Sequence, residues 1–209
     1  MQKTIFALAT GNQIAALSVI RVSGQGSERI LKKLTLKNTP TERLLTLRNF
    51  YFPKSNKKLI DRCLVVWMPA PRSYTGEDCI EIYSHGGDAV FQGFFSALIS
   101  FPNVRYAQQG EFSKRAIING KTDLVKAEAV NDLINALTEK QRELAISQFS
   151  RGLSIPITKW RKEIIKCMSL IEANIDFSDE SDTPESVNIT NELLMLREQV
   201  KGAIKNKDY

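Results

Sequence analysis

Hydrophobic residues in the first part of the chain form short runs that turn residues separate. The run over 16–22 is rich in β-branched residues and ends at a Ser-Gly pair, so it predicts a strand. The runs over 48–52 and 62–68 also predict strands, and the second is almost entirely apolar and therefore expected to be buried. A further strand is expected over 80–87, where it ends at two glycines.

Helical spacing of apolar residues alternates with these strands. Segment 27–36 repeats its apolar residues every three to four positions, and Ser27 is the expected N-cap. Segment 89–101 has an apolar face of the same period. Helices interspersed with strands in this order predict an α+β fold class.

The pattern changes near residue 119, after which it is helical throughout. We therefore expect a first domain over 1–118 and a helical domain over 119–209. The expected helices run from a capping Asp123 to the interruption at Gly152 and Pro156, over 157–175, and from a capping Thr190 to residue 206.

Composition excludes several classes of protein. Among the 209 residues 43% are apolar, which is too many for a disordered chain, yet no stretch approaches the roughly 20 apolar residues of a membrane span. The N-terminus does not resemble a signal peptide. Cys63, Cys79 and Cys167 lie far apart, which favours reduced thiols in the cytoplasm over a disulfide scaffold or a zinc ribbon.

The net charge of +6 is unevenly distributed. Residues 1–62 carry 12 basic and 3 acidic side chains, whereas residues 63–209 carry 17 basic and 20 acidic ones. This basic excess has two interpretations: a solvated rim of surface loops, or a surface that faces tRNA or another polyanion.

Two glycine-rich motifs resemble nucleotide-binding loops but are incomplete. Gly24-Gln25-Gly26 lies between a predicted strand and a predicted helix, but Arg29 occupies the third glycine position of a dinucleotide fingerprint. Gly120-Lys121-Thr122 resembles the end of a P-loop, but Arg115 replaces the first glycine, without which the loop cannot wrap a phosphate. We expect neither site.

The single histidine, His85, is expected to have its ring held by backbone atoms in the turn that follows its strand. A metal site would need ligands at a suitable spacing, and only carboxylates are available. No elbow for a nucleophilic serine is present either. We interpret the acidic residues 176–180 as a helix-end surface, so no catalytic residue and no metal site are expected in this chain.

Three groups of residues occur together in a distinctive order. They comprise 70–78 with Glu81 and 85–87; 110–116 with 119–121, 123–124 and 127–130; and 171–180, and the opening segments 4–10 and 19–24 agree with them. Their order and spacing, over essentially the whole chain, resemble those of the tRNA-modification GTPases of the MnmE (TrmE) family.

The resemblance implies an α+β domain that binds a tetrahydrofolate and forms a homodimer, followed by a helical domain into which a Ras-like GTPase domain is inserted. Such proteins act with MnmG (GidA), an FAD protein. Together they add an aminomethyl or carboxymethylaminomethyl group to the wobble uridine of tRNA. The folate, as a 5-formyl or 5,10-methylene derivative, supplies the one-carbon unit, and GTP hydrolysis depends on K⁺ and Mg²⁺. The chain is expected to stop before the GTPase domain.

The family's folate contacts correspond to Arg21, Glu81 and Lys121. A pterin edge presents an N–H beside an exocyclic amine, which a carboxylate such as Glu81 accepts side by side. Arg21 and Lys121 suit the carboxylates of the folate tail, without an assignment of which cation meets which group. A structural ion pair is the alternative for each residue.

The sequence departs from the family's usual pattern at the loop 11–16, at Gln109 and at Thr122, and the first change bears on the folate's fit. Two alternative functions remain open from the residues. One is a tRNA-docking module, and the other is a stand-alone folate-dependent aminomethyltransferase that resembles the glycine-cleavage T-protein.

Overall fold

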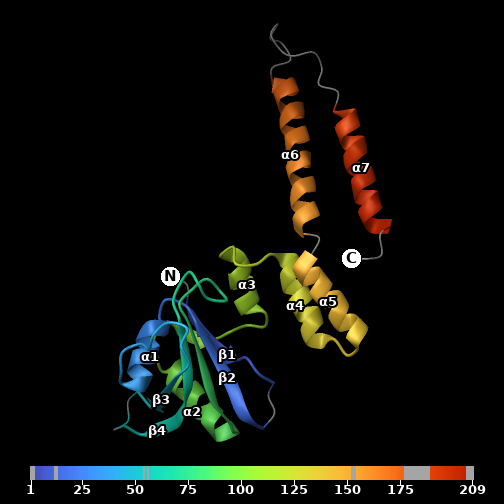
Figure 1. Cartoon of the computed structure of the whole chain (residues 1–209). Coiled ribbons are helices and arrows are strands. Elements are labelled where there is room, and N and C mark those ends of the chain that lie inside the picture. Colours follow the sequence, from blue (N-terminus) through green and yellow to red (C-terminus); the bar gives the residue numbers. More distant parts are fainter. Residues whose placement is uncertain are drawn as a thin grey trace. The chain divides into compact units, whose positions relative to one another are not determined.

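The chain folds into two compact units, residues 1–122 and 123–209 (Figure 1). The computed structural model describes residues 3–11, 14–53, 55, 57–151, 154–176 and 189–205. The first unit combines a mixed sheet with helices and the second is helical, so the predicted α+β class is correct. Among the described residues, none of the helices has the length and apolar character that crossing a membrane requires.

A six-stranded sheet organises the first unit, in the order β3-β4-β5-β2-β1-β6. Adjacent strands of the sheet are antiparallel, except that β6 runs parallel to β1. The strands are β1 (Thr4–Leu8), β2 (Ala15–Ser23), β3 (Thr46–Tyr51), β4 (Leu59–Met68), β5 (Cys79–Gly86) and β6 (Val104–Tyr106). Strands β1 and β6 were not predicted, because they are short and contain too few residues for a period-two pattern to be recognised.

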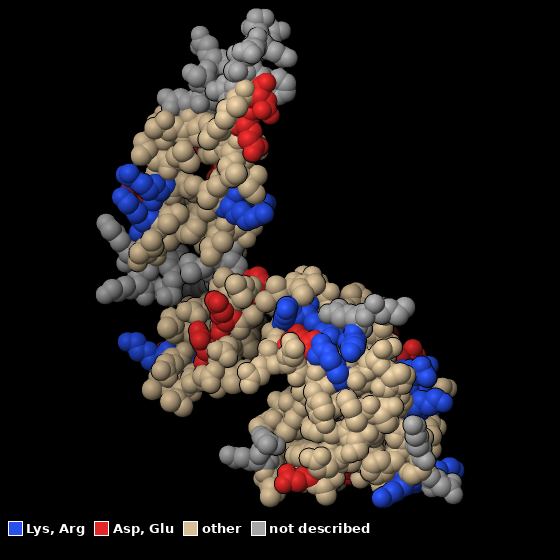
Figure 2. Space-filling model, turned by 180° about the vertical axis from the view of Figure 1, so that it is seen from behind, with Lys and Arg blue, Asp and Glu red and all other residues tan. Residues whose placement is uncertain are grey.

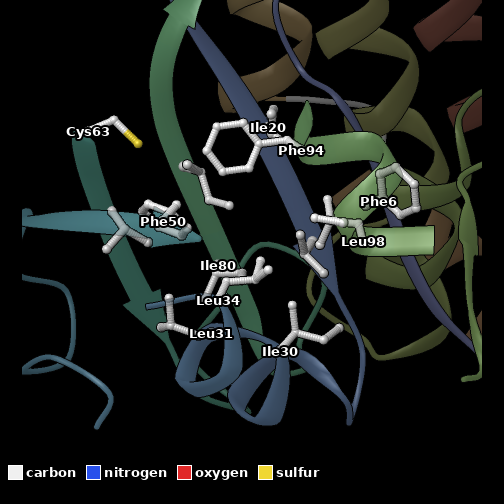
Figure 3. Packing of buried hydrophobic residues seen from close by; sticks show 14 of the residues in the cluster. Phe6, Ile20, Ile30, Leu31, Leu34, Phe50, Cys63, Ile80, Phe94 and Leu98 are labelled. Atoms are coloured by element: carbon white, nitrogen blue, oxygen red, sulfur yellow. The ribbon is translucent and has the colours of Figure 1, made fainter. Parts of the chain in front are cut away.

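The core lies between one face of this sheet and helices α1 (Ser27–Thr35) and α2 (Asp88–Ile99) (Figure 3). Because side chains alternate along a strand, the residues that face the helices on β2 and β5 are even-numbered. The fully buried members from these four elements are Ile20, Val22, Ile30, Leu31, Leu34, Ile80, Ile82, Phe94, Ala97 and Leu98. The odd-numbered residues of β2 and β5 therefore lie on the opposite face of the sheet.

The start of α1 differs from the expectation that Ser27 is its N-cap. The cap position is Gly26, whose amide donates to Thr4 Oγ1 (3.0 Å), and the Ser27 hydroxyl is buried without a hydrogen-bond partner. A Cβ on Gly24, at φ +133°, would lie 2.8 Å from the Thr4 Cα, and one on Gly26 would lie 2.8 Å from Thr4 Oγ1. Close packing of this turn against β1 thus accounts for both glycines.

The first unit ends after residue 122 rather than residue 118. Helix α3 (Glu111–Ile118) is followed by a turn in which the Lys121 amide donates to the Ala116 carbonyl (2.8 Å). The Asn119 side chain donates to the Thr75 carbonyl (2.7 Å). These bonds attach residues 119–121 to the first unit.

The second unit contains helices α4 (Leu124–Asn135), α5 (Glu139–Arg151), α6 (Ser154–Asp176) and α7 (Thr190–Lys205) among its described residues. Helix α4 packs on α5, and α6 lies beside α7. The expected cap is present, because the Asp123 carboxylate accepts from the Lys126 amide (2.9 Å). The expected loop after Asp176 and the acidic residues 177–180 lie outside the described residues.

The expectation of a single helix from Asp123 to Gly152 is wrong, because a reciprocal capping box divides it. The Gln141 amide donates to Thr138 Oγ1 (3.2 Å), and Gln141 Oε1 accepts from the Thr138 amide (3.0 Å). The sequence Thr-x-x-Gln is the signal for such a box. Pro156 also fails to delay the next helix, since a proline in the first turn removes no intrahelical hydrogen bond.

Candidate binding site

The pairing of β2 with β5 brings Arg21 and Glu81 together. Arg21 lies directly opposite Glu81 in this antiparallel ladder, on the sheet face away from α1 and α2. Residues directly opposite have their Cβ atoms close enough for side chains to interact. The strand register, rather than a loop, therefore sets the position of both charged groups.

An ion pair joins the two side chains. Arg21 Nε donates to Glu81 Oε1 (2.8 Å), and Arg21 Nη2 lies 2.7 Å from the same oxygen. Tyr83, two positions further along β5, donates its hydroxyl to Glu81 Oε2 (3.1 Å). Burial, and then the charge of Glu81, raise the pKa of Tyr83, so its phenol stays protonated as a donor. Both carboxylate oxygens of Glu81 thus have partners.

Two aromatic rings contact the Arg21 guanidinium, and we call Tyr74 and Phe112 the aromatic pair. The guanidinium carbon lies 4.7 Å from the centroid of Tyr74 and 5.6 Å from that of Phe112. Tyr74 comes from the loop between β4 and β5, whereas Phe112 is on α3. The Tyr74 hydroxyl lies 3.0 Å from Ser113 Oγ, so the loop and the helix also touch beside the rings. Such cation–π contacts stabilise a site by about 0.5–2 kcal/mol each.

Lys121 lies against the same loop. A Cβ placed on Gly76, whose φ is +77°, would come within 3.1 Å of Lys121 Cγ and 3.2 Å of its Cδ. The lysine side chain therefore runs along the backbone of Gly76 to an exposed end. No ion pair joins Lys121 to a carboxylate in the described part of the chain. Of the three expected site residues, Arg21 and Glu81 are in contact and Lys121 keeps an uncommitted charge.

Four charged residues joined by ion pairs form a second cluster, which we call the ion cluster: Glu77, Arg105, Glu111 and Arg115. Arg115 Nη1 lies 3.1 and 2.9 Å from the two carboxylate oxygens of Glu77, and its Nη2 lies 3.0 Å from Glu111 Oε1. Arg105 binds both oxygens of Glu111, at 2.7 and 2.6 Å. These bonds, those from Arg105 first, lower the pKa of Glu111 to about 2.

Comparisons with known proteins agree with the motifs. Residues 4–121 match the family model described as GTP-binding protein TrmE N-terminus, and residues 124–209 match that of the MnmE helical domain. The chain belongs to the MnmE (TrmE) family.

Relatives come from bacteria and from a mammal. The tRNA modification GTPase MnmE of Rhodopseudomonas palustris (strain HaA2) is 46% identical over 180 residues, which cover 86% of this chain and 38% of that protein. The MnmE of Chelativorans sp. (strain BNC1) is 39% identical, over 96% of this chain and 45% of its own length. The mitochondrial 5-taurinomethyluridine tRNA synthase subunit GTPB3 of Mus musculus is 44% identical, over 88% and 37%. The chain thus spans less than half the length of these relatives.

The structure corrects one expectation about the MnmE-family motif at the end of β5. The His85 ring is bound by a side chain, not by backbone: its Nδ1 lies 2.9 Å from Asp61 Oδ1 on β4, and the His85 amide donates to Asp61 Oδ2 (3.0 Å). No group of three or more potential metal ligands occurs among the described residues. His85 therefore links β5 to β4 through its hydrogen bonds to Asp61.

Sequence reasoning did not single out the aromatic pair or Tyr83. Tyr74 and Phe112 stand within the quoted family motifs, but they are 38 positions apart and no periodicity connects them. Tyr83 had a detectable signal, because it lies two positions from Glu81 on a predicted strand and so shares its face. Gly120-Lys121, which resembled the end of a P-loop, follows helix α3 instead of preceding a helix after a strand.

Proposed function

We propose that this chain binds a tetrahydrofolate through Arg21, Glu81 and Lys121, as the N-terminal part of a tRNA-modification GTPase. The observation that carries the proposal is the Glu81 carboxylate, only 14% exposed and paired with the Arg21 guanidinium that contacts the aromatic pair. The ligand is a 5-formyl- or 5,10-methylene-tetrahydrofolate. When bound, this group supplies the one-carbon unit for modification of uridine.

The chemistry of the donor set fits a folate. Glu81 offers carboxylate oxygens to the adjacent N–H and amine of a pterin edge, which is a charge-assisted arrangement. Tyr74 and Phe112 offer ring faces to planar groups. Because Arg21 is already paired with Glu81, we assign Arg21 to orienting that carboxylate. Lys121, with its uncommitted charge, then receives the carboxylates of the glutamyl tail.

Calorimetric titration of the chain with 5-formyl-tetrahydrofolate tests this proposal. Glu81→Gln removes a charged acceptor and is expected to weaken binding at least tenfold, since hydrogen bonds to charged groups contribute about 1.5–3 kcal/mol. Lys121→Gln removes the proposed, exposed ion pair with the glutamyl tail and is expected to weaken binding about two- to fivefold. Lys114→Gln, an exposed lysine on α3, is the matched control and is expected to bind like the wild type.

A ligand without the glutamyl tail separates the role of Glu81, which binds the pterin, from that of Lys121, which binds the tail. A tetrahydropterin without the glutamyl tail should respond to Glu81→Gln and not to Lys121→Gln. Absence of heat with the wild-type chain at saturating folate would refute the function. Equal sensitivity of both ligands to Lys121→Gln would refute the assignment of Lys121 to the tail.

For the whole protein we propose the activity that the family name implies. Such a protein would hydrolyse GTP with K⁺ and Mg²⁺ in a further domain, and would act in the cytoplasm with MnmG on the wobble uridine of tRNA. The support is family membership and the names of the relatives. The match of residues 124–209 to the MnmE helical domain favours this function over a stand-alone aminomethyltransferase.

Homodimerisation through the first unit is part of the same proposal. A row of three side chains crosses the sheet on the face away from α1 and α2. Leu47 on β3 lies opposite Leu64 on β4, which in turn lies opposite Tyr83 on β5. Leu47 is 48% exposed and Leu64 is 40% exposed. A row of exposed apolar side chains across a sheet is a surface that a second copy can cover.

A tRNA-docking surface is the second candidate function, and the basic excess of residues 1–62 favours it. On the face of the first unit seen in Figure 2, however, Lys and Arg side chains lie in separate groups with other residues between them. Filter binding across a salt series tests this function. Contacts to phosphates require a steep linear fall of log affinity with log salt concentration, and a flat response would exclude them.

A further inference from the structure

Arg115 is the largest fully buried side chain among the described residues, and it forms hydrogen bonds to three segments of the first unit. Its Nη1 binds Glu77 of the β4–β5 loop, and its Nη2 binds Glu111 one turn earlier on α3. The same Nη2 donates to the Lys3 carbonyl at the start of the chain (2.8 Å). A single guanidinium, 2% exposed, thus joins the loop, the helix and the segment before β1.

The groups that Arg115 joins also carry the aromatic pair. Glu77 follows Tyr74 by three residues in the loop, and Phe112 precedes Arg115 by three residues on α3. Glu77 is fixed further, because Ser23 donates its hydroxyl to Glu77 Oε2 (2.7 Å). Ser23 ends β2, two residues after Arg21. The guanidinium therefore ties together the backbones from which Tyr74, Phe112 and Arg21 project.

At the far end of α3 the Asn119 side chain also donates to the Thr75 carbonyl of this loop (2.7 Å), but the further contact beside the aromatic rings is exposed. It is the contact between the Tyr74 and Ser113 hydroxyls, whose hydrogen bond competes with water. Charge-assisted hydrogen bonds in a buried setting fix geometry more firmly. Removing one partner of a buried ion pair is costly, but the pair by itself is weak evidence for a gain in stability. The ion cluster is therefore better explained by the geometry that it imposes.

We propose that Arg115 is a positioning residue for the binding site, which holds the aromatic pair against the Arg21 guanidinium through its bonds to Glu77 and Glu111. This inference rests on the proposed function, because the role that it assigns to Arg115 is to shape the folate site. The residue touches no ligand itself. Its effect on binding passes through Tyr74 and Phe112.

Arg115→Lys is the test variant, because it keeps the charge but replaces the fork that spans Glu77, Glu111 and the Lys3 carbonyl with one ammonium group. We expect the affinity for 5-formyl-tetrahydrofolate to fall at least tenfold. In a Tyr74→Ala, Phe112→Ala background the same substitution should cost less than threefold, because the groups that it positions are gone. Such a double-mutant cycle isolates the coupling.

Ile82→Val is the matched control, since it shortens a buried side chain on β5 on the opposite face from Glu81. It is expected to lower Tm while leaving the folate affinity unchanged. If Arg115→Lys lowers only Tm, or if its cost in affinity is equal in both backgrounds, Arg115 is a structural residue and the inference is wrong.

Hydrogen exchange provides a readout that needs no ligand. Amides of residues 73–77 should exchange at least tenfold faster in Arg115→Lys than in the wild type, and at the wild-type rate in Ile82→Val. If the wild type binds no folate but this exchange pattern is found, the proposed function fails and the link from Arg115 to the loop stands. Unchanged exchange in Arg115→Lys overturns the link, whatever the wild type binds.

Discussion

Gly76 and Lys121 come from segments 45 positions apart, and the lysine stem lies so close to the glycine that a methyl group on Gly76 would be 3.1 Å from Lys121 Cγ. Gly76 also has a φ of +77°, which L-residues with a side chain rarely adopt. The path of Lys121 over the loop thus requires glycine at position 76, because any side chain there would occupy the space of the lysine stem.

Gly76→Ala should therefore affect both stability and binding. We expect the free energy of unfolding to fall by about 1–2 kcal/mol, because alanine is strained in the left-handed region. Folate affinity should also fall several-fold as Lys121 is displaced. Gly87→Ala is the control, since a Cβ there meets nothing within 4 Å and its φ is −94°. Urea unfolding and calorimetry of both variants measure the effects, and equal losses in the two would argue against this role of Gly76.

Glu111→Gln should make stability less dependent on acid. The pKa of Glu111 is lowered from 4.5 to about 2, so its ionised form stabilises the fold fully above about pH 4.5 and loses this contribution as the pH falls toward 2. The shift corresponds to about 3 kcal/mol at pH 7. We expect Glu111→Gln to be less stable than the wild type by about that amount at pH 7, in urea unfolding.

The difference in the free energy of unfolding between the wild type and Glu111→Gln should shrink as the pH is lowered from about 4.5 toward 2. Glu139→Gln is the control: Arg142 also lowers the pKa of Glu139, but this pair is exposed on α5, so its loss should change the acid unfolding curve far less. A gap between Glu111→Gln and the wild type that stays constant from pH 7 to pH 2.5 would contradict the assignment.

The thiols of Cys63 and Cys79 should be unreactive in the folded chain. Burial raises the pKa of Cys79 to about 12, and burial with the nearby Asp61 raises the pKa of Cys63 further. Because the thiolate is the reactive form, alkylation by iodoacetamide at pH 8 should be at least a hundredfold slower at these two residues than in urea. Mass spectrometry of tryptic peptides measures each site, and rapid native labelling of Cys79 would show that β5 opens.

Leu64→Glu should dissociate the proposed homodimer. The substitution places a charge in the middle of the apolar row on the uncovered sheet face, where a second copy would have to bury it. Sedimentation equilibrium should show a dimer for the wild type and a monomer for this variant. Ile99→Glu, on an exposed residue at the end of α2, is expected to remain dimeric. A wild-type chain that is still monomeric at about 100 μM would refute the proposal.

Much of the sheet was predictable from sequence, because period-two patterns and turn residues are local signals. Strand β2 over Ala15–Ser23 lies within a residue or so of the expected 16–22. The N-cap of α1 was not predictable in this way, because the hydroxyl that accepts from Gly26 belongs to Thr4 on another strand. The division between α4 and α5 had a local signal in Thr138 and Gln141 that the helical period obscured.

The candidate site shows the same limit. Arg21 and Glu81 were inferred from family resemblance, and nothing in the sequence indicated that they are register partners. Phe112 was not recognised as a neighbour of Arg21, because helix α3 itself was not predicted. Its eight residues show too few apolar repeats for a period to emerge, and the helix is fixed instead by the buried bonds of Arg115.

Two peptide bonds separate Lys121 from Asp123, the residue that caps the first helix of the second unit. The residue proposed to receive the folate tail and the residue that caps α4 therefore belong to one three-residue segment, 121–123. A change of backbone conformation at Thr122 would reach both of them. Variants of this segment would therefore alter ligand affinity and the start of α4 together.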